Sequence, residues 1–133
     1  MIQLSELASR ILAHLEEAHA ENVSSTINTV ESVRGNIEEI SHAQSALLQL
    51  TNLDLVRIAY EDAKTGKFIP ISKDQSIVDI STINDRLRFS DAERIWRWDQ
   101  NFPMMEILAT PAGLAKSREI LAKRGYEWWR HQE

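Results

Sequence analysis

The stretch AQSALLQLTNLDLVRIAYEDAKTGKFIPIS, residues 43–72, contains the change of periodicity that decides the fold. Up to Asn52 the apolar residues recur at helical spacing, and from Val56 onward they alternate as in a half-buried strand. EDAKTGK then reads as a hairpin loop in which Gly66 takes a positive φ, and FIPI reads as the return strand. Pro70 has no N–H to donate to a ladder, so we expect the return strand at a sheet edge.

Helical patterns precede this stretch. LSELASRILAHLEEAH carries its apolar residues on one face at 100° per residue and predicts an amphipathic helix, and ENVSSTINTV predicts a short second one. Asn36 is a favourable N-cap for a third helix, with Glu38 and Glu39 in the first turn, where the helix dipole favours carboxylates. We expect the inward face of this third helix to hold Ile37, Ile40, Ala43, Leu47 and Leu50.

Residues 72–99 read as helical again. SKDQSIVDISTI and SDAERIWRW each begin with a serine that is followed three residues later by Gln or Glu, which is the pattern of a capping box. We therefore predict a helical insertion over 72–99, between the hairpin and the last strand.

The end of the chain predicts a strand and a helix. MMEILAT is a short apolar run typical of a strand. Thr110 at the N-cap and Pro111 at the first helical position predict a C-terminal helix over 110–130. No repeat, low-complexity segment or long linker interrupts residues 1–133, so we expect a single domain.

Three helices followed by a hairpin is the element order of a winged helix. The segment ALLQLTNLDLV, residues 46–56, resembles the ending A-L-x-x-L-x-x-x-G-L-V that is common where the third helix of winged-helix proteins closes and the wing begins. Asp54 stands where glycine is usual, and Asp tolerates positive φ better than most residues. ILATPAGLAKSREIL resembles the way bacterial winged-helix regulators close.

The resemblance covers most of residues 1–71 and 104–124 and departs from the family at 72–99. It implies a mostly α fold with a small antiparallel β wing, in the α+β class, with a helical insertion before the last strand and a C-terminal helix. Because many functions share one fold, it does not fix the function.

In this family the third helix enters the major groove of double-stranded DNA, so the resemblance implies a DNA-binding, transcriptional-regulator-like protein that works as a homodimer. Polar side chains on the outward face of that helix would read bases, and nearby cations would hold phosphates. The base-reading residues would be Ser41, His42, Ser45 and Gln49. The phosphate contacts would be Arg34, Lys64 and Lys67.

The charge distribution leaves a second hypothesis open. The net charge of the chain is −5, with −6 in residues 1–56 and +1 in residues 57–133. A nucleic-acid binder usually carries a basic surface, and the third helix has no Lys or Arg. The polar face of this helix and the charged hairpin would then be ordinary solvent-exposed surfaces that contact no DNA. On this hypothesis the chain is a winged-helix protein-protein interaction module that does not bind DNA.

The aromatic residues gather late in the chain, where Trp96, Trp98, Trp128 and Trp129 account for all four tryptophans. They can form a core that joins the insertion to the final helix, or a surface for a partner. Adjacent Trp128 and Trp129 would point about 100° apart on a helix. We therefore expect one of them to contact a protein partner or a second copy of the chain.

A basic stripe on the last predicted helix has a simpler reading. Lys116, Lys123 and Arg130 recur every seven residues and so share one face. Glu119 lies four residues before Lys123, which is a favourable spacing for an ion pair. This stripe predicts an ion-paired surface rather than a DNA contact.

Several classes of function have no support in the residues. The chain has no cysteine, which excludes disulfides, thiolate zinc sites and a Cys nucleophile. No phosphate loop, nucleophile elbow or paired-carboxylate motif is present, so we expect no enzyme activity, no cofactor and no metal. No apolar run approaches the length of a membrane span, and we expect a cytoplasmic protein.

Overall fold

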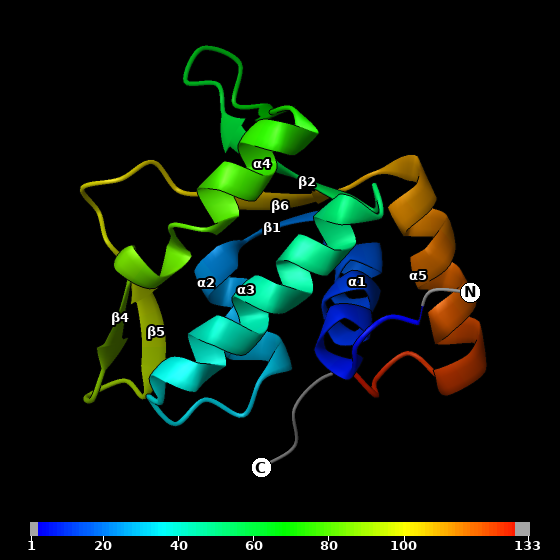
Figure 1. Cartoon of the computed structure of the whole chain (residues 1–133), viewed down its shortest axis with the longest axis horizontal. Helices are drawn as coiled ribbons and strands as arrows, with labels where there is room; N and C mark the ends of the chain where they lie inside the picture. The colour runs from blue at the N-terminus through cyan, green and yellow to red at the C-terminus, as the bar shows by residue number, and fades with distance from the viewer. Residues whose placement is uncertain (1–2, 130–133) are drawn as a thin grey trace.

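The computed structural model describes residues 3–129, which form helices and two antiparallel sheets (Figure 1). In chain order the elements are α1 (Glu6–Ala18), β1 (Ala20–Asn22), α2 (Val23–Val30), α3 (Ile37–Asn52), β2 (Val56–Glu61), β3 (Phe68–Pro70), α4 (Lys73–Ile80), the 3-10 helix η1 (Ile83–Asp85), β4 (Leu87–Ser90), β5 (Ile95–Trp98), β6 (Glu106–Ala109) and α5 (Pro111–Arg124). The predicted α+β class is confirmed.

The larger sheet is built from strands that lie far apart in the sequence. Its order is β1-β6-β2-β3, so the last strand of the chain lies between the first two. Leu108 of β6 faces Ala20 of β1 on one side and Arg57 of β2 on the other. The return strand β3 lies at an edge of this sheet, as Pro70 predicts.

The turn between α3 and β2 follows the sequence prediction closely. Asp54 has φ 60°, the left-handed conformation expected at this position. The Leu55 N–H donates to the carbonyl of Leu50 at 2.9 Å, which closes the end of the helix. The chain then enters β2 at Val56, so the change of periodicity in the sequence marks the true boundary.

The core lies between α1, α2, α3 and the inner face of the larger sheet, and α5 packs along α1 (Figure 1). α1, α2, α3, β2 and β6 all contribute fully buried residues: Ile11, Leu12, Leu15, Ile27, Ile40, Leu47, Leu50, Ile58 and Ile107. Ile37 is the exception among the expected inward residues of α3, with 60% of its surface exposed. It occupies the first turn of the helix, which extends beyond the core.

The predicted helical insertion is only partly helical. The first half contains α4 and η1, and Ser72 caps α4 by accepting a hydrogen bond from the Gln75 N–H at 3.1 Å. The second half, predicted as a helix, is wrong: it is the β4–β5 hairpin. The Ser90 hydroxyl does accept from the Glu93 N–H at 3.2 Å, but this bond closes a hairpin turn instead of capping a helix.

The C-terminal helix begins as predicted and ends early. The Thr110 hydroxyl accepts from the Gly113 N–H at 3.0 Å, and Pro111 is the first helical residue. The helix ends at Arg124 because Gly125 takes φ 93° and leaves the helical path. The prediction of helix as far as residue 130 is therefore wrong from Gly125 to Trp129, and residue 130 lies outside the described residues.

Within residues 3–129 no helix is both long and apolar enough to span a membrane.

Candidate nucleic-acid interface

The outer face of α3 carries the side chains expected to read bases. Ser41, His42 and Ser45 are exposed and Gln49 is half-buried, while the opposite face of the helix is in the core. The helix is held in place by its N-cap, since the Asn36 side chain accepts a hydrogen bond from the Glu38 N–H at 3.0 Å. α3 therefore presents a continuous polar stripe on a rigid element.

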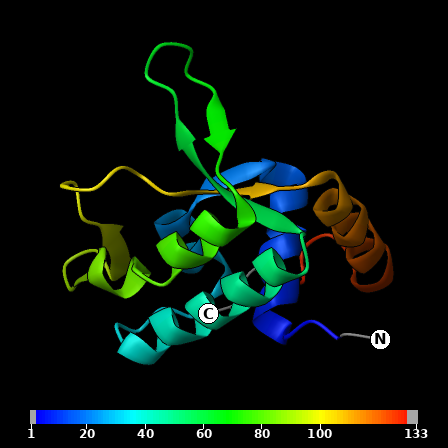
Figure 2. The ribbon, with the colours of Figure 1, turned by 45° about the horizontal axis from the view of Figure 1, so that its top comes forward.

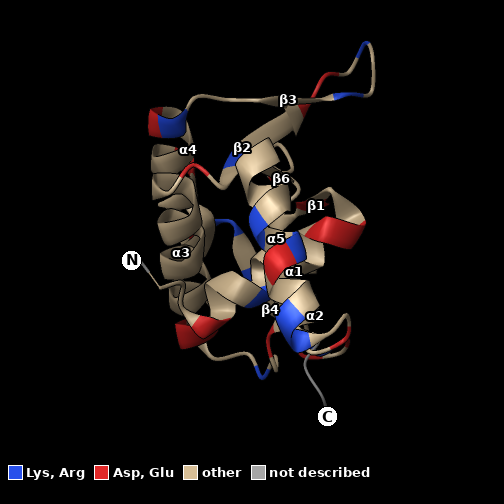
Figure 3. Ribbon diagram, turned by 90° about the vertical axis from the view of Figure 1, so that its right-hand side faces the viewer, with Lys and Arg blue, Asp and Glu red and all other residues tan. Residues whose placement is uncertain are grey.

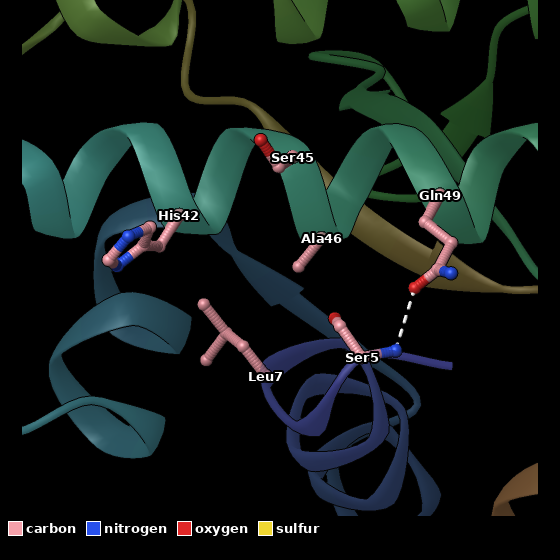
Figure 4. A pocket seen from close by; sticks show the side chains of 6 residues that line it. All are labelled: Ser5, Leu7, His42, Ser45, Ala46 and Gln49. Atoms are coloured by element: carbon pink, nitrogen blue, oxygen red, sulfur yellow. Dashed lines mark hydrogen bonds between the residues drawn. The ribbon is translucent and has the colours of Figure 1, made fainter. Parts of the chain in front are cut away.

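A groove of about 400 Å³ runs between this stripe and the start of α1 (Figure 4). From α3 it is lined by His42, Ser45, Ala46 and Gln49, and from the α1 side by Ser5 and Leu7. Three of the four predicted base-reading residues thus share one groove, and Ser41 lies outside its lining. The groove could not be predicted from the sequence, because only the fold brings Ser5 and Leu7 beside α3.

The segment before α1 occupies the hydrogen-bonding groups of Gln49. The Ser5 N–H donates to the Gln49 side-chain oxygen at 2.9 Å, a bond drawn in Figure 4. The Gln49 side-chain nitrogen donates to the carbonyl of Gln3 at 3.3 Å. A base must compete with these bonds for the Gln49 amide, whereas no side-chain hydrogen bond within residues 3–129 restrains His42 or Ser45.

Carboxylates lie at the N-terminal end of the stripe. Figure 3 shows α3 with acidic residues in its first turn and with no Lys or Arg along its length. Glu39 has a structural role: its carboxylate accepts from Trp96 Nε1 at 2.9 Å and from the backbone N–H of Arg34 at 2.9 Å. Burial, with the nearby Glu39 charge, raises the pKa of Glu31 to about 7. The first turn of α3 thus carries two carboxylates, Glu38 and Glu39, and no cation.

The cations nearest the C-terminal end of α3 are already paired. Asp54 contacts Arg57 Nη2 at 2.6 Å and Lys73 Nζ at 3.5 Å, and the hydrogen bond from Arg57 is the main reason that the pKa of Asp54 is lowered. Lys73 Nζ also donates to the carbonyl of Asn52, the last residue of α3, at 2.9 Å. Arg57 and Lys73 thus stabilise the end of the helix.

The β2–β3 hairpin projects from the body of the protein (Figure 2). Lys64 and Lys67 are exposed near its tip, and no carboxylate within residues 3–129 pairs with either ammonium group. The Asp62 carboxylate shapes the loop by accepting from the Lys64 N–H at 3.0 Å. Gly66 has φ 71°, as predicted for this turn.

The structure does not bring the hairpin cations beside the polar stripe of α3. In Figures 1 and 2, α4 lies between the hairpin and α3. Arg34 is exposed in the loop before α3, at the end of the helix away from β2. The predicted phosphate contacts therefore lie in two separate places, one before α3 and one beyond α4.

The two C-terminal tryptophans pack against their own chain. Trp129 is 2% exposed, and its ring centroid lies 4.9 Å from that of His14 on α1. Trp128 is half-buried beneath the guanidinium of Arg124, at 3.5 Å from the ring centroid, with that of Arg10 at 5.7 Å. Because α5 ends at Arg124, the separation of about 100° expected of neighbours on a helix does not apply to Trp128 and Trp129.

The basic stripe on α5 is ion-paired, as predicted. Glu119 contacts Lys116 Nζ at 3.3 Å and Lys123 Nζ at 3.5 Å. Arg130 lies outside the described residues. Among residues 3–129, no group of three or more His, Asp or Glu side chains is placed to hold a metal ion.

No protein-family model, curated protein or solved structure matches this chain.

Proposed function

We propose that this protein is a winged-helix DNA-binding protein of the transcriptional-regulator type, with α3 as its recognition helix. The observation that carries the proposal is the exposure of a polar stripe along α3, on a helix whose other face is buried. The sheet order supports it as well. β6 returns after the 72–99 segment to pair with the hairpin strand β2, as expected of the last strand of a wing. In helix-turn-helix proteins a helix of this kind enters the major groove.

In this proposal α3 and the cations have different tasks. Ser41, His42 and Ser45 hydrogen-bond base edges and set specificity, with Gln49 joining them when the N-terminal segment moves away. Arg34, Lys64 and Lys67 contact phosphates and supply affinity. Because the cations lie apart from the stripe, their removal lowers affinity for all sequences alike.

The deciding experiment is the titration of random-sequence duplex DNA with the protein, followed by fluorescence anisotropy across a salt series. Three phosphate contacts give a slope of log K against log[salt] of about −2.7 for each protomer. Lys64→Ala with Lys67→Ala weakens binding and makes the slope shallower by about 1.8. No binding at low salt contradicts the proposal.

A matched control is available on α5. Lys116→Ala with Lys123→Ala removes the same charge from the surface, but both of these lysines are paired with Glu119. We expect this variant to keep the slope of the wild-type protein. An equal loss of slope in both double variants would mean that DNA responds to net charge and makes no contact with the hairpin.

A second candidate is the protein-protein interaction module, favoured by the apolar side chains of an edge strand. Phe68 is 39% exposed and Ile69 is 51% exposed on β3, and the outer face of α3 carries no cation. An edge strand can receive a further strand from a partner. This candidate predicts no DNA binding at low salt, together with a partner complex that Ile69→Asp dissociates and Lys116→Ala does not.

A further inference from the structure

A second pocket lies on the other side of α4 from the polar stripe. Its volume is about 130 Å³, and its walls come from β2, α4, the end of β5 and the loop before β6. The residues that matter for its chemistry are Tyr60, Asp79, Thr82, Arg86, Trp98 and Phe102. These residues are far apart in the sequence and are brought together only by the fold.

Arg86 is a half-buried cation at this pocket, and no carboxylate within residues 3–129 pairs with it. Its guanidinium lies over the ring of Phe102, with the central carbon 3.5 Å from the ring centroid. Stacking on an aromatic face fixes the plane of a guanidinium and leaves its N–H edge available for a planar acceptor.

Asp79, the acidic residue of the pocket, already accepts hydrogen bonds from two other side chains. Asp79 Oδ2 accepts from the Tyr60 hydroxyl at 2.5 Å, and Asp79 Oδ1 accepts from the side-chain nitrogen of Gln75 at 2.7 Å. Both carboxylate oxygens therefore have donors other than Arg86. The pocket combines a guanidinium that lacks a counterion in the described chain with a carboxylate that already accepts one hydrogen bond at each oxygen.

The apolar part of the lining comes from Trp98, Phe102, Pro103 and Met105, on residues separate from the polar part. Trp98 is 8% exposed and is held by a hydrogen bond from its Nε1 to the carbonyl of Phe102 at 3.2 Å. Met105, 2% exposed, lies on the same side. The volume is close to the ~150 Å³ cavity that holds benzene in an engineered protein. A ligand with a body of about one ring therefore fits.

We propose that this pocket binds a small monocarboxylate with a flat apolar body, whose carboxylate pairs with the N–H edge of Arg86 and whose body lies against Trp98. Planar carboxylates match a guanidinium in a two-bond geometry. The apolar walls favour a ligand with a hydrocarbon body over a bare oxyanion. This inference does not depend on DNA binding, and it gives the protein a small-molecule site under α4.

The test uses benzoate as the probe and follows the backbone amides of the ¹⁵N-labelled protein by NMR. We expect saturable shifts at Tyr60, Thr82 and Trp98, with Kd on the order of 1 mM. Benzyl alcohol, which keeps the ring and lacks the charge, serves as the ligand control and should bind at least tenfold more weakly. Inorganic phosphate, the bare oxyanion, should also bind at least tenfold more weakly.

The matched protein variants are Arg86→Gln and Arg88→Gln. Arg88 is exposed on the outer face of β4, so its substitution makes the same change in net charge away from the pocket. We expect Arg86→Gln to weaken benzoate binding at least tenfold and Arg88→Gln to leave it unchanged. Equal losses in the two variants would mean that benzoate responds to the overall field, and would overturn the proposal.

Contacts in the wild-type protein decide the question even if Arg86→Gln does not fold. Intermolecular NOEs from benzoate to the rings of Trp98 and Phe102 are the expected result. Saturable binding without NOEs to either ring would place the ligand elsewhere and overturn the proposal. Absence of shifts at about 10 mM benzoate, or binding of phosphate as tight as that of benzoate, would also overturn it.

Discussion

Gly113, in the first turn of α5, is the glycine with the least space for a side chain. A Cβ built at this position would lie 1.9 Å from the carbonyl oxygen of Leu55, well inside van der Waals contact. That oxygen also accepts the Thr110 N–H at 3.0 Å, so it cannot move freely. We expect Gly113→Ala to lower the free energy of unfolding by about 2–4 kcal/mol, measured by urea denaturation.

Gly125→Ala separates this clash from ordinary backbone strain. Gly125 has φ 93°, and a Cβ there would meet no atom within 4 Å. Its substitution should cost only about 1–2 kcal/mol, from the positive φ alone. A loss at Gly113 no larger than that at Gly125 would show that α5 shifts to accommodate the methyl group.

Glu106, like Glu31, is a carboxylate whose charge the fold disfavours. Its pKa is raised to about 7, mainly by burial and further by the charges of Glu21 and Glu61. The folded protein therefore favours the protonated acid. The contribution of this group to stability is fully present below about pH 4.5 and is lost as the pH rises to about 7.

Glu106→Gln removes this pH dependence. At pH 8 we expect the variant to be more stable than the wild-type protein by about 1–2 kcal/mol, after allowance for the solvent that screens a half-buried group. At pH 4 the two proteins should differ little. Urea denaturation at both pH values provides the measurement, with the exposed Glu38→Gln as the control. A difference that does not change with pH would contradict the assignment.

Single residues differ in how well the sequence predicts their roles. Asp54 could be predicted because its conformation depends on neighbours within the same turn. The stripe of α3 could be predicted from helical spacing. The hydrogen bonds of the Gln49 side chain could not be predicted, because its partners Gln3 and Ser5 are 46 and 44 residues away. Helical spacing predicts which face of the helix a side chain occupies, but it does not predict which distant residues the side chain contacts.

At the scale of elements, one side chain of α2 binds the backbone of the β4–β5 hairpin. Asn28 Nδ2 donates to the carbonyl of Trp96 at 2.9 Å, and its Oδ1 accepts from the Trp96 N–H at 2.9 Å. This pair of bonds replaces the missing neighbour strand at one residue of β5. The hairpin is therefore tied to the helical core as well as packed on it.

Asn28→Ala should loosen this hairpin. Because both backbone groups of Trp96 lose their partner, we expect a loss of about 2–3 kcal/mol in the free energy of unfolding. Hydrogen exchange should show faster exchange of the Trp96 amide than in the wild-type protein. Asn84→Ala, at an exposed position in η1, is the control and should change stability by less than about 0.5 kcal/mol.

The same hairpin explains the largest error of the sequence interpretation. Leu87, Trp96 and Trp98 are buried on one side, and Arg88 and Arg97 are exposed on the other, which is a spacing of two. The serine-to-glutamate spacing at its turn is equally typical of a helix start. In a hairpin of four-residue strands the alternation is too short to outweigh a capping signal.

At the scale of the whole molecule, the DNA proposal includes a dimer, because each chain offers few cations for phosphate contacts. Arg34, Lys64 and Lys67 provide few phosphate contacts for one chain of net charge −5. Two copies double those contacts and bind two half-sites. Sedimentation equilibrium should therefore give twice the mass of the 15.3 kDa chain, at least when DNA is bound. A single protomer on each DNA site would contradict this prediction.

The overall architecture was within reach of the sequence because most of its boundaries are marked by local signals. Caps at Asn36, Ser72 and Thr110 begin α3, α4 and α5. The pockets were not within reach, because each is lined by residues from elements that meet only after the sheet closes. The same holds for Trp128 and Trp129, whose positions depend on where α5 ends.

The central place of β6 in the larger sheet has a consequence for synthesis on the ribosome. β1 and β2 leave the exit tunnel long before residues 106–109, yet each needs β6 as its neighbour. Until β6 arrives, the nascent chain exposes the edges of two strands, which are sites of mispairing between chains. Translation that pauses before residue 106 would therefore leave a helical intermediate that depends on chaperones, and a chain truncated there would aggregate.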